Sequence, residues 1–263
     1  KTLDYMDALS KGVERRIAHA PAILKPLLQL EAARLARYEA EVFAAFEHKA
    51  IISQQDRALI DHGQRDAIAV IPNGVDPLFF ESLHQEKEYE VLFTGNMSYP
   101  PNVDSACYLV RDIMPLVWRE HPEARVLISG ANPAGKVRAL AGAKVTVTGW
   151  VEDIRHSYAR SQIFAAPMQI GTGLQNKLLE AMAMQLPCVT SPLANNALGA
   201  APDAEILIGT DTASFASAIV ALLDNTILYD RIAAAGHSYV RARFDWDKTT
   251  DQLEQLMVTP STA

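Results

Sequence analysis

The sequence predicts an α/β protein built on one doubly wound, parallel sheet and preceded by part of a second domain. Between residues 89 and 224, short apolar runs alternate with segments of helical periodicity, which is the order found in parallel sheets with crossover helices. Residues 1–72 differ, because they contain one long amphipathic segment and only two short apolar runs. At 263 residues, the chain is long enough for one large domain or two smaller ones.

The sheet domain is expected to contain six strands, which is enough for one doubly wound unit. The apolar runs predict strands at residues 90–94, 125–129, 144–148, 162–166, 187–190 and 205–208. The segments between them predict helices at residues 102–121, 133–141, 153–160, 175–185 and 212–224. Asp211 and Thr212 can cap the last of these helices, because side-chain oxygens there accept hydrogen bonds from the first helical amides.

The segment before the sheet domain reads as the tail end of another domain. Apolar residues at helical spacing over residues 23–48 predict one long amphipathic helix, and residues 50–53 and 67–71 predict two short strands. Two strands and one helix cannot close a core of their own. We therefore divide the chain into the tail of an N-terminal domain at 1–72, a linker at 73–88, the sheet domain at 89–244, and a final helix with its tail at 245–263.

Composition and charge exclude several classes of function. The net charge of −7 argues against a nucleic-acid partner, which requires a basic face. No run of 18 apolar residues occurs, so no membrane span is expected, although peripheral contact stays open. The two cysteines and the scattered histidines have no metal or redox spacing, which favours buried free thiols, a reducing cytoplasmic compartment and no metal. Since the first residue is Lys1, we expect a fragment of a longer protein.

The most informative segment is residues 171–187, GTGLQNKLLEAMAMQLP. It places a glycine-bracketed turn between a buried strand and an amphipathic helix. Unpartnered backbone amides and the helix macrodipole favour an anion at such a helix start. Lys177 adds a full positive charge one turn into the helix, and Glu180 lies three residues further on. Without the turn, such a pair is most often a solvated pair; with it, the pattern predicts a site for a diphosphate and a sugar hydroxyl.

Five motifs occur in the order seen in a known family: IPNGVD at 71–76, LFTGN at 92–96, LISG at 127–130, VTGWVED at 147–153 and LLEAMAMQLPCV at 178–189. Together they resemble the GT-B retaining glycosyltransferases, and most closely the large family-four group with its exopolysaccharide sugar transferases. The resemblance extends from residue 51 to the C-terminus. It implies two Rossmann-like domains that face each other across a cleft, with a nucleotide-sugar donor held by the C-terminal one.

The resemblance also implies roles for individual residues. Lys177 is expected at the diphosphate and Glu180 at the ribose hydroxyls, and these two are the candidate catalytic residues. The other candidate donor-binding residues lie at the first strand-to-helix turn, near the base, and at the glycine turn with the helix start: Gly95, Asn96, Trp150, Val151, Gly171, Thr172, Gly173, Leu174 and Asn176. Residues 245–256 resemble the final helix, which crosses back to the other domain.

Two departures from the family pattern matter. Family members commonly carry an arginine and a lysine after the first strand of this domain, but here residues 96–102 read NMSYPPN. The family's pair of glutamates is eight positions apart, and eight positions before Glu180 stands Thr172. Lys177 therefore carries more of the positive charge expected at the diphosphate, and the donor sugar stays open. The family's histidine near the reacting centre comes from the part of the N-terminal domain upstream of Lys1.

By resemblance, the function is transfer of a sugar from a nucleotide diphosphate sugar to a saccharide or lipid-linked acceptor in polysaccharide synthesis, without a cofactor or metal. A nucleotide-sugar epimerase of the same fold and a non-catalytic nucleotide-sugar binding module are the alternatives. The fragment alone is expected to be inactive. Contact with the inner face of the membrane is a further expectation, as is a homodimer or chain swap that covers the apolar face of residues 23–48.

Three features also have plainer explanations. Trp150 could be an ordinary core aromatic residue. Residues 73–76, NGVD, are expected to supply turn chemistry. Asp245 and Asp247 have the spacing that another glycosyltransferase architecture uses for a divalent metal, but here they precede a helix. We therefore expect one of them to cap that helix.

Overall fold

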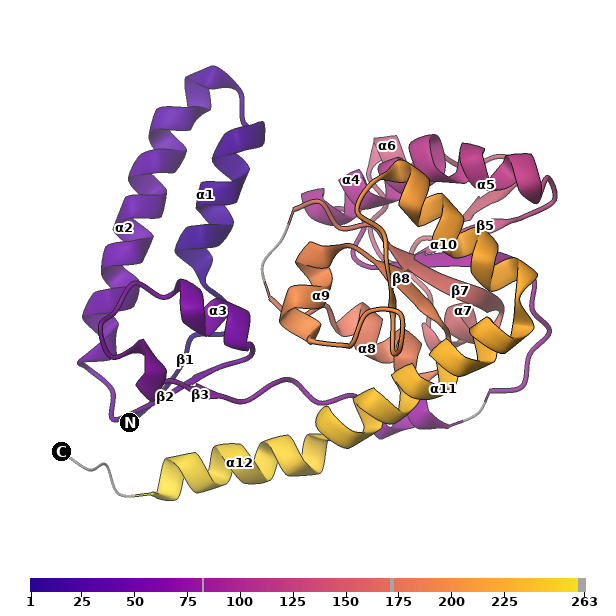
Figure 1. Cartoon of the computed structure of the whole chain (residues 1–263). Coiled ribbons are helices and arrows are strands. Elements are labelled where there is room, and N and C mark those ends of the chain that lie inside the picture. The colour runs from indigo at the N-terminus through magenta and orange to yellow at the C-terminus, as the bar shows by residue number, and fades with distance from the viewer. Residues whose placement is uncertain (82, 171–172, 260–263) are drawn as a thin grey trace.

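The structure, a computed structural model, describes residues 1–81, 83–170 and 173–259, and within them it contains two parallel sheets (Figure 1). The larger sheet has six strands in the order β6-β5-β4-β7-β8-β9, and the smaller one has three in the order β1-β2-β3. All strand pairs in both sheets are parallel. The predicted α/β class with a doubly wound parallel sheet is confirmed.

All six predicted strands of the larger sheet are present. They are β4 (Tyr89–Thr94), β5 (Val126–Ser129), β6 (Val145–Val147), β7 (Ser161–Ala166), β8 (Cys188–Thr190) and β9 (Leu207–Ile208). The chain adds β5 and β6 on one side of β4 and then returns to add β7, β8 and β9 on the other side. The strand order therefore reverses beside β4, and ligands of open α/β sheets bind at the carboxyl ends of the strands at such a point.

The central strands are apolar over most of their buried length, at residues 91–93 of β4 and 163–166 of β7, because helices cover both faces of the sheet (Figure 1). Phe93 of β4 is paired in register with Ile128 of β5, and both side chains are fully buried. On the other side, Leu92 is paired with Phe164 of β7, and these side chains are fully buried as well. This core holds the carboxyl ends of β4, β5 and β7 in fixed positions.

The predicted helices are found, several of them shorter than expected. The region predicted at 102–121 forms α4 (Pro100–Tyr108), η4, a π-helical segment (Leu109–Ile113), and α5 (Met114–Glu120). The others are α6 (Gly135–Arg138), α7 (Arg155–Ala159), α8 (Asn176–Ala183) and α10 (Thr212–Asp224). The predicted cap of α10 is confirmed, since Asp211 accepts a hydrogen bond from the Ser214 amide at 2.7 Å.

Two helices of this region were not predicted. One is α9 (Pro192–Leu198), which follows β8 and is capped by Ser191. The other is α11 (Thr226–Arg243), which begins at the cap residue Asn225 and packs against α8. The alanine- and glycine-rich middle of α11 gives it little apolar periodicity, so the sequence pattern did not reveal it.

Residues 1–72 contain more structure than expected. The small sheet has three strands, β1 (Thr2–Asp4), β2 (His48–Ile51) and β3 (Ala69–Val70). The long helix predicted at 23–48 is shorter, and as α2 (Lys25–Phe43) it pairs with α1 (Leu9–His19) in a hairpin whose turn contains η1 (Ala22–Leu24). Two further short helical segments are α3 (Gln54–Leu59) and η2 (Arg65–Ala67). A separate small apolar cluster lies here, formed by Tyr5, Ala8, Phe43, Ile51, Ile60 and Ile68.

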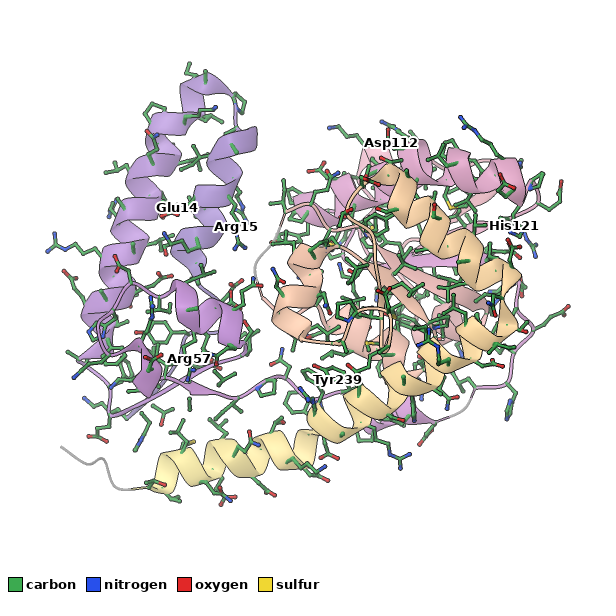
Figure 2. All side chains as sticks on the ribbon, in the orientation of Figure 1. Glu14, Arg15, Arg57, Asp112, His121 and Tyr239 are labelled. Atoms are coloured by element: carbon green, nitrogen blue, oxygen red, sulfur yellow. The ribbon has the colours of Figure 1, made fainter. Side chains whose placement is uncertain are left out.

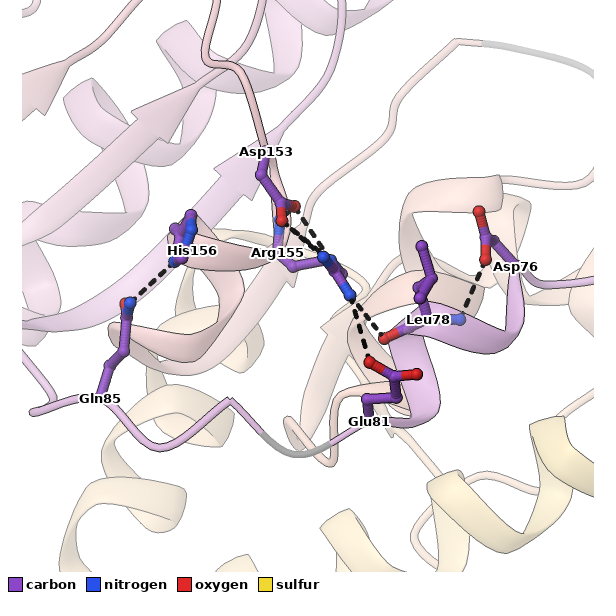
Figure 3. A network of polar contacts seen from close by, with 7 residues as sticks. All are labelled: Asp76, Leu78, Glu81, Gln85, Asp153, Arg155 and His156. Carbon is purple, nitrogen blue, oxygen red and sulfur yellow. Dashed lines mark hydrogen bonds and ion pairs between the residues drawn. The ribbon is translucent and has the colours of Figure 1, made fainter.

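The segment predicted as a linker, 73–88, is held against the larger unit by polar contacts (Figure 3). It contains η3 (Pro77–Phe80), whose cap is Asp76. The Arg155 guanidinium donates to the Leu78 carbonyl at 3.1 Å and to the Asp153 carboxylate at 2.7 Å. The hydrogen bond from Arg155 and its charge hold the pKa of Asp153 below the ordinary range. Residues 76, 78 and 81 of this segment are therefore bound in place by polar contacts.

The chain also returns from the larger unit toward the smaller one. Helix α12 (Trp246–Val258) begins beside the 73–76 turn and extends to β2 (Figure 1). The Val75 amide donates to the Phe244 carbonyl at 2.7 Å, and Val75 forms an isolated parallel bridge with Asp245. The two passages of the chain between the units are thus bonded to each other.

Candidate functional site

A pocket of about 460 Å³ opens at the carboxyl ends of β4 and β5, beside the start of α8. It lies where the strand order reverses, the place at which this class of sheet binds ligands. Eight of the candidate residues line it together: Gly95, Asn96, Trp150, Val151, Leu174, Asn176, Lys177 and Glu180. The pocket thus joins four segments that are far apart in the sequence.

Two glycines allow the strand ends to approach each other at the pocket. Gly95 follows β4 with φ +151°, and Gly130 follows β5 with φ +138°. A Cβ atom at Gly130 would lie only 1.9 Å from the Gly95 carbonyl oxygen. The backbone can therefore form this part of the wall only if Gly130 has no side chain.

The Lys177 amine lies largely buried at this pocket. Its Nζ donates a hydrogen bond to Asn102 Oδ1 and lies 4.9 Å from the centroid of the Phe93 ring. Burial lowers the pKa of Lys177 to about 8, and the nearby charge of Glu180 opposes this effect. Since the hydrogen-bond partner is a neutral amide, the positive charge is left available for an incoming anion.

Glu180 is fixed by a buried tyrosine. The Tyr158 hydroxyl donates to Glu180 Oε2 at 2.8 Å and lies 2.8 Å from Thr94 Oγ1. Burial raises the pKa of Glu180, while the hydrogen bond from Tyr158 and the charge of Lys177 act in the opposite direction. Both Lys177 and Glu180 are largely buried, so the solvated-pair interpretation does not fit this geometry.

The start of α8 supplies the third element of the site. Helix α8 begins at Asn176, and the preceding residue, Gln175, makes no side-chain cap. Both residues line the pocket, so the positive end of the helix dipole adds to the charge of Lys177 there. The Asn176 side chain accepts a hydrogen bond from Asn73 Nδ2 at 3.3 Å, which connects the 73–76 turn to the edge of the site.

Some of the candidate residues lie elsewhere. Gly171 and Thr172 fall outside the described residues. Gly173, with φ +80°, does not line the pocket but faces the smaller unit, where a Cβ atom would lie 3.6 Å from Asp7 Oδ2 and 3.8 Å from Asp56 Oδ2. Burial raises the pKa of Asp56 to about 6, and the neighbouring charge of Asp7 adds to the rise, whereas a hydrogen bond from Ser53 lowers it.

The structure settles two of the plainer explanations. Trp150 is 72% exposed at the edge of the pocket, so it is not a core residue. Asp245 caps α12 by accepting a hydrogen bond from the Lys248 amide at 3.1 Å, as predicted.

In the described part of the chain, no cluster of three or more His, Cys, Asp or Glu side chains could hold a metal ion.

Sequence reasoning missed two residues of the site, Asn102 and Tyr158. Asn102 Nδ2 donates to the Asn96 carbonyl at 3.0 Å while its Oδ1 accepts from Lys177. It thereby connects the turn after β4 to the lysine, 75 positions later in the sequence. Neither residue lies in a recognisable local motif. Each contacts a residue that is distant in the sequence, and only the fold brings the two segments together.

The fold is that of a Rossmann-like unit with a pocket at the strand-order reversal, and comparison with known proteins gives the family. Residues 88–225 match the family model described as glycosyl transferases group 1. The chain therefore belongs to the group 1 glycosyltransferase family, which confirms the resemblance seen in the motifs.

Curated relatives are similar at the level of sequence. The chain is 30% identical over 206 residues to a phosphatidyl-myo-inositol mannosyltransferase of Mycobacterium tuberculosis, covering 72% of this chain and 53% of that protein. It is 31% identical over 205 residues to the corresponding protein of Mycobacterium leprae, covering 73% and 54%. The chain thus spans about half the length of the curated relatives it matches.

Solved structures show the same fold at low sequence identity. Anabaena Alr3699/HepE in complex with UDP and glucose superposes with a TM-score of 0.75 at 15% identity, covering 98% of this chain and 71% of that chain. Sucrose-phosphate synthase from Thermosynechococcus elongatus gives 0.71 at 17% identity, covering 97% and 66%. These matches extend over both sheets, so the GT-B class predicted for the fold is confirmed.

One further observation concerns the membrane. Among the helices described, none is by itself long and apolar enough to cross a bilayer; α10 and α11 meet the criterion only as a pair bent by 105°.

Proposed function

We propose that this chain is the donor-binding part of a retaining glycosyltransferase, which transfers a sugar from a nucleotide diphosphate sugar to a saccharide or lipid-linked acceptor in polysaccharide synthesis. One observation carries the proposal: the pocket at the strand-order reversal brings together a buried lysine amine bonded to a neutral amide, a glutamate and an uncapped helix start. The family assignment supports it, as do relatives named as mannosyltransferases and a neighbour crystallised with UDP and glucose.

In this proposal, the diphosphate binds against the backbone after β4 and the start of α8. Lys177 neutralises the negative charge that grows on the leaving diphosphate as the glycosidic bond breaks. One preorganised donor of this kind is typically worth ~3 kcal/mol, or about two orders of magnitude in rate. As part of an active enzyme, Lys177→Ala would therefore lower turnover more than any other single change in this pocket.

The remaining roles follow from the chemistry of the groups present. Glu180 accepts hydrogen bonds from the ribose hydroxyls, and because these bonds hardly change during the reaction, it acts mainly on binding. Trp150 and Val151 contact the base from the edge of the pocket. The backbone amide of Leu174, which lines the pocket, binds the phosphates or the sugar, and by the family resemblance Gly171 and Thr172 have the same role. No cofactor or metal ion is needed, because the helix start and Lys177 supply the positive charge.

A reducing, cytoplasmic location is part of the proposal. It is supported by the absence of a disulfide in the described residues, where Cys188 is buried and Cys107 half-buried and both are free thiols.

The test is a thermal-shift and calorimetric panel of sugar nucleotides on the chain. GDP-mannose and UDP-glucose are tested first. One relative is named as a GDP-mannose-dependent mannosyltransferase, and one similar structure is a complex with UDP-glucose. A bound donor raises the unfolding temperature by mass action. Lys177→Ala should lower donor affinity by about ten- to a hundredfold, since a hydrogen bond to a charged group contributes ~1.5–3 kcal/mol.

Lys136→Ala is a matched control, because Lys136 lies on α6 and does not line the pocket. It should leave donor affinity unchanged. No heat and no thermal shift with any sugar nucleotide would instead indicate a non-catalytic scaffold. Conversion of a bound donor to an altered sugar nucleotide without any acceptor would indicate an epimerase.

A further inference from the structure

A second cavity, of about 210 Å³, lies between helix α1 and the larger unit, and we call it the α1 cavity. Leu9, Gly12, Val13 and Arg16 line it, and because they follow one another at helical spacing, one face of α1 forms this wall. Figure 2 shows Arg15, which also lines the cavity, on the flank of α1 that faces the larger unit. None of these residues lines the donor pocket.

The α1 cavity and the donor pocket share two segments of the larger unit as walls. Between β4 and α4, Tyr99 and Pro101 line the α1 cavity, while Asn102 lines the donor pocket. Around the glycine turn, Ile170 lines the α1 cavity and Leu174 lines the donor pocket. A sugar that is held at the glycine turn therefore has the α1 cavity beside it.

The size and the walls of the α1 cavity suit one sugar ring. Pockets that enclose drug-sized ligands measure ~300–1,000 Å³, so the α1 cavity is smaller than these. Val13, Tyr99 and Ile170 give it apolar walls, against which the C–H groups of a sugar ring can pack. Tyr99 is 44% exposed, so part of its ring is open to a ligand.

Arg16 is the cation that the cavity offers to a ligand. It is exposed, and within the described ranges it has no hydrogen bond or ion pair, whereas Arg37 of α2 is paired with Glu41 at 2.6 Å. Arg15 already takes part in a polar contact, so the inference rests on Arg16. The guanidinium group matches a carboxylate or a phosphate with two parallel hydrogen bonds.

The cavity also has a defined direction. Asp7 lines the end nearest the glycine turn, since its Oδ2 lies 3.6 Å from the position of a Cβ atom at Gly173. Arg16 lies seven residues after Leu9 along α1, ~10 Å at the helical rise. The positive charge is therefore separated from the glycine turn by about the length of one sugar unit.

We propose that the α1 cavity binds the acceptor and that this acceptor is an acidic sugar, with its carboxylate or phosphate on Arg16. The inference rests on the proposed function, because it takes the glycine turn as the place of the donor sugar. The apolar side chains pack against the ring of the acceptor. Its reacting hydroxyl points toward Asp7 and the glycine turn, about one sugar unit away from the acidic group.

The experiment is calorimetric titration of the full chain with glucuronic acid, glucose 6-phosphate and glucose at constant ionic strength. We expect one of the acidic sugars to bind at least about tenfold more tightly than glucose, and the tighter one identifies the acid as carboxylate or phosphate. Arg16→Gln should remove at least about tenfold of that affinity, the size of a hydrogen bond to a charged group. Inorganic phosphate alone should bind more weakly, since it cannot use the apolar walls.

Two controls separate this site from its surroundings. Arg34→Gln makes the same charge change at an exposed residue of α2 that does not line the cavity, and it should bind the acidic sugars as the parent chain does. Lys177→Ala should also keep that binding while it loses affinity for sugar nucleotides. Arg16→Gln should show the reverse pattern.

Three outcomes would overturn the inference: equal or absent binding of acidic and neutral sugars, an acid preference that survives Arg16→Gln, or inorganic phosphate that binds as tightly as the sugars. Any of these, together with normal binding of a sugar nucleotide, refutes the acidic acceptor alone. Acid preference that depends on Arg16, without binding of any sugar nucleotide, refutes the proposed function and leaves the sugar site standing.

Discussion

At the scale of single residues, the burial of Lys177 determines how the site responds to pH. The amine donates to a neutral amide of Asn102, and burial places its pKa at about 8. An anion that binds beside it favours the charged form and so raises this pKa. Between about pH 8 and the raised pKa of the complex, donor binding is therefore coupled to the uptake of a proton.

We predict that donor affinity is highest below pH 8 and falls as the pH rises above it. The sign follows because the free lysine is then neutral and has to be protonated on binding. Calorimetry at pH 7 and pH 9, in buffers of different ionisation enthalpy, measures the uptake directly. Lys177→Arg serves as the comparison, because a guanidinium stays charged over this range and should remove the dependence on pH. An unchanged dependence in that variant would mean that another group titrates.

Tyr158 positions Glu180, and its hydroxyl can be removed without changing the ring. Tyr158→Phe should destabilise the chain by about 1–3 kcal/mol, because buried Thr94 and Glu180 oxygens lose a partner. It should also weaken donor binding, since Glu180 is no longer held. Tyr229→Phe is the control, because the Tyr229 hydroxyl donates to the Gln162 carbonyl at 2.9 Å away from the pocket. Urea unfolding and calorimetry together distinguish the two effects: the control should lose stability only.

At the scale of elements, the close approach of the turns after β4 and β5 depends on Gly130. Gly130→Ala places a Cβ atom 1.9 Å from the Gly95 carbonyl oxygen at a φ of +138°. We expect a loss of at least ~2 kcal/mol in the free energy of unfolding, from strain and from displaced backbone. Gly135→Ala, at the start of α6 where nothing lies within 4 Å of the added carbon, should change stability little. Equal stability of the two variants would contradict the proposed close approach.

The elements also show which parts of the fold can be predicted from the sequence. The six strands of the larger sheet were predicted because each is a short apolar run between turn residues, a local signal. Helix α11 and strand β1 were missed, since the first has weak apolar periodicity and the second is only three residues long. In the site, Lys177 and Glu180 could be found from the turn and the helix that carry them. Asn102 and Tyr158 could not, because their partners are distant in the sequence.

At the scale of the whole molecule, the two units are joined where the 73–76 turn meets the start of α12. A Cβ atom at Gly74 would lie 2.6 Å from Trp246 Cα. We predict that Gly74→Ala loosens this junction while leaving the donor pocket intact. Limited proteolysis should then cut the chain faster within 72–76 or 243–247, with donor affinity unchanged. Gly63→Ala, where nothing lies within 4 Å, should be cleaved like the parent chain. A drop in donor affinity without faster cleavage would refute this assignment.

The bond between Val75 and Phe244 has a consequence for motion. The chain passes between the two units twice, at residues 73–76 and at the start of α12. Because a hydrogen bond joins these two segments, they cannot move apart independently. They form a single junction of two crossing segments, so a force that acts on one segment is transmitted to the other at residues 75 and 244.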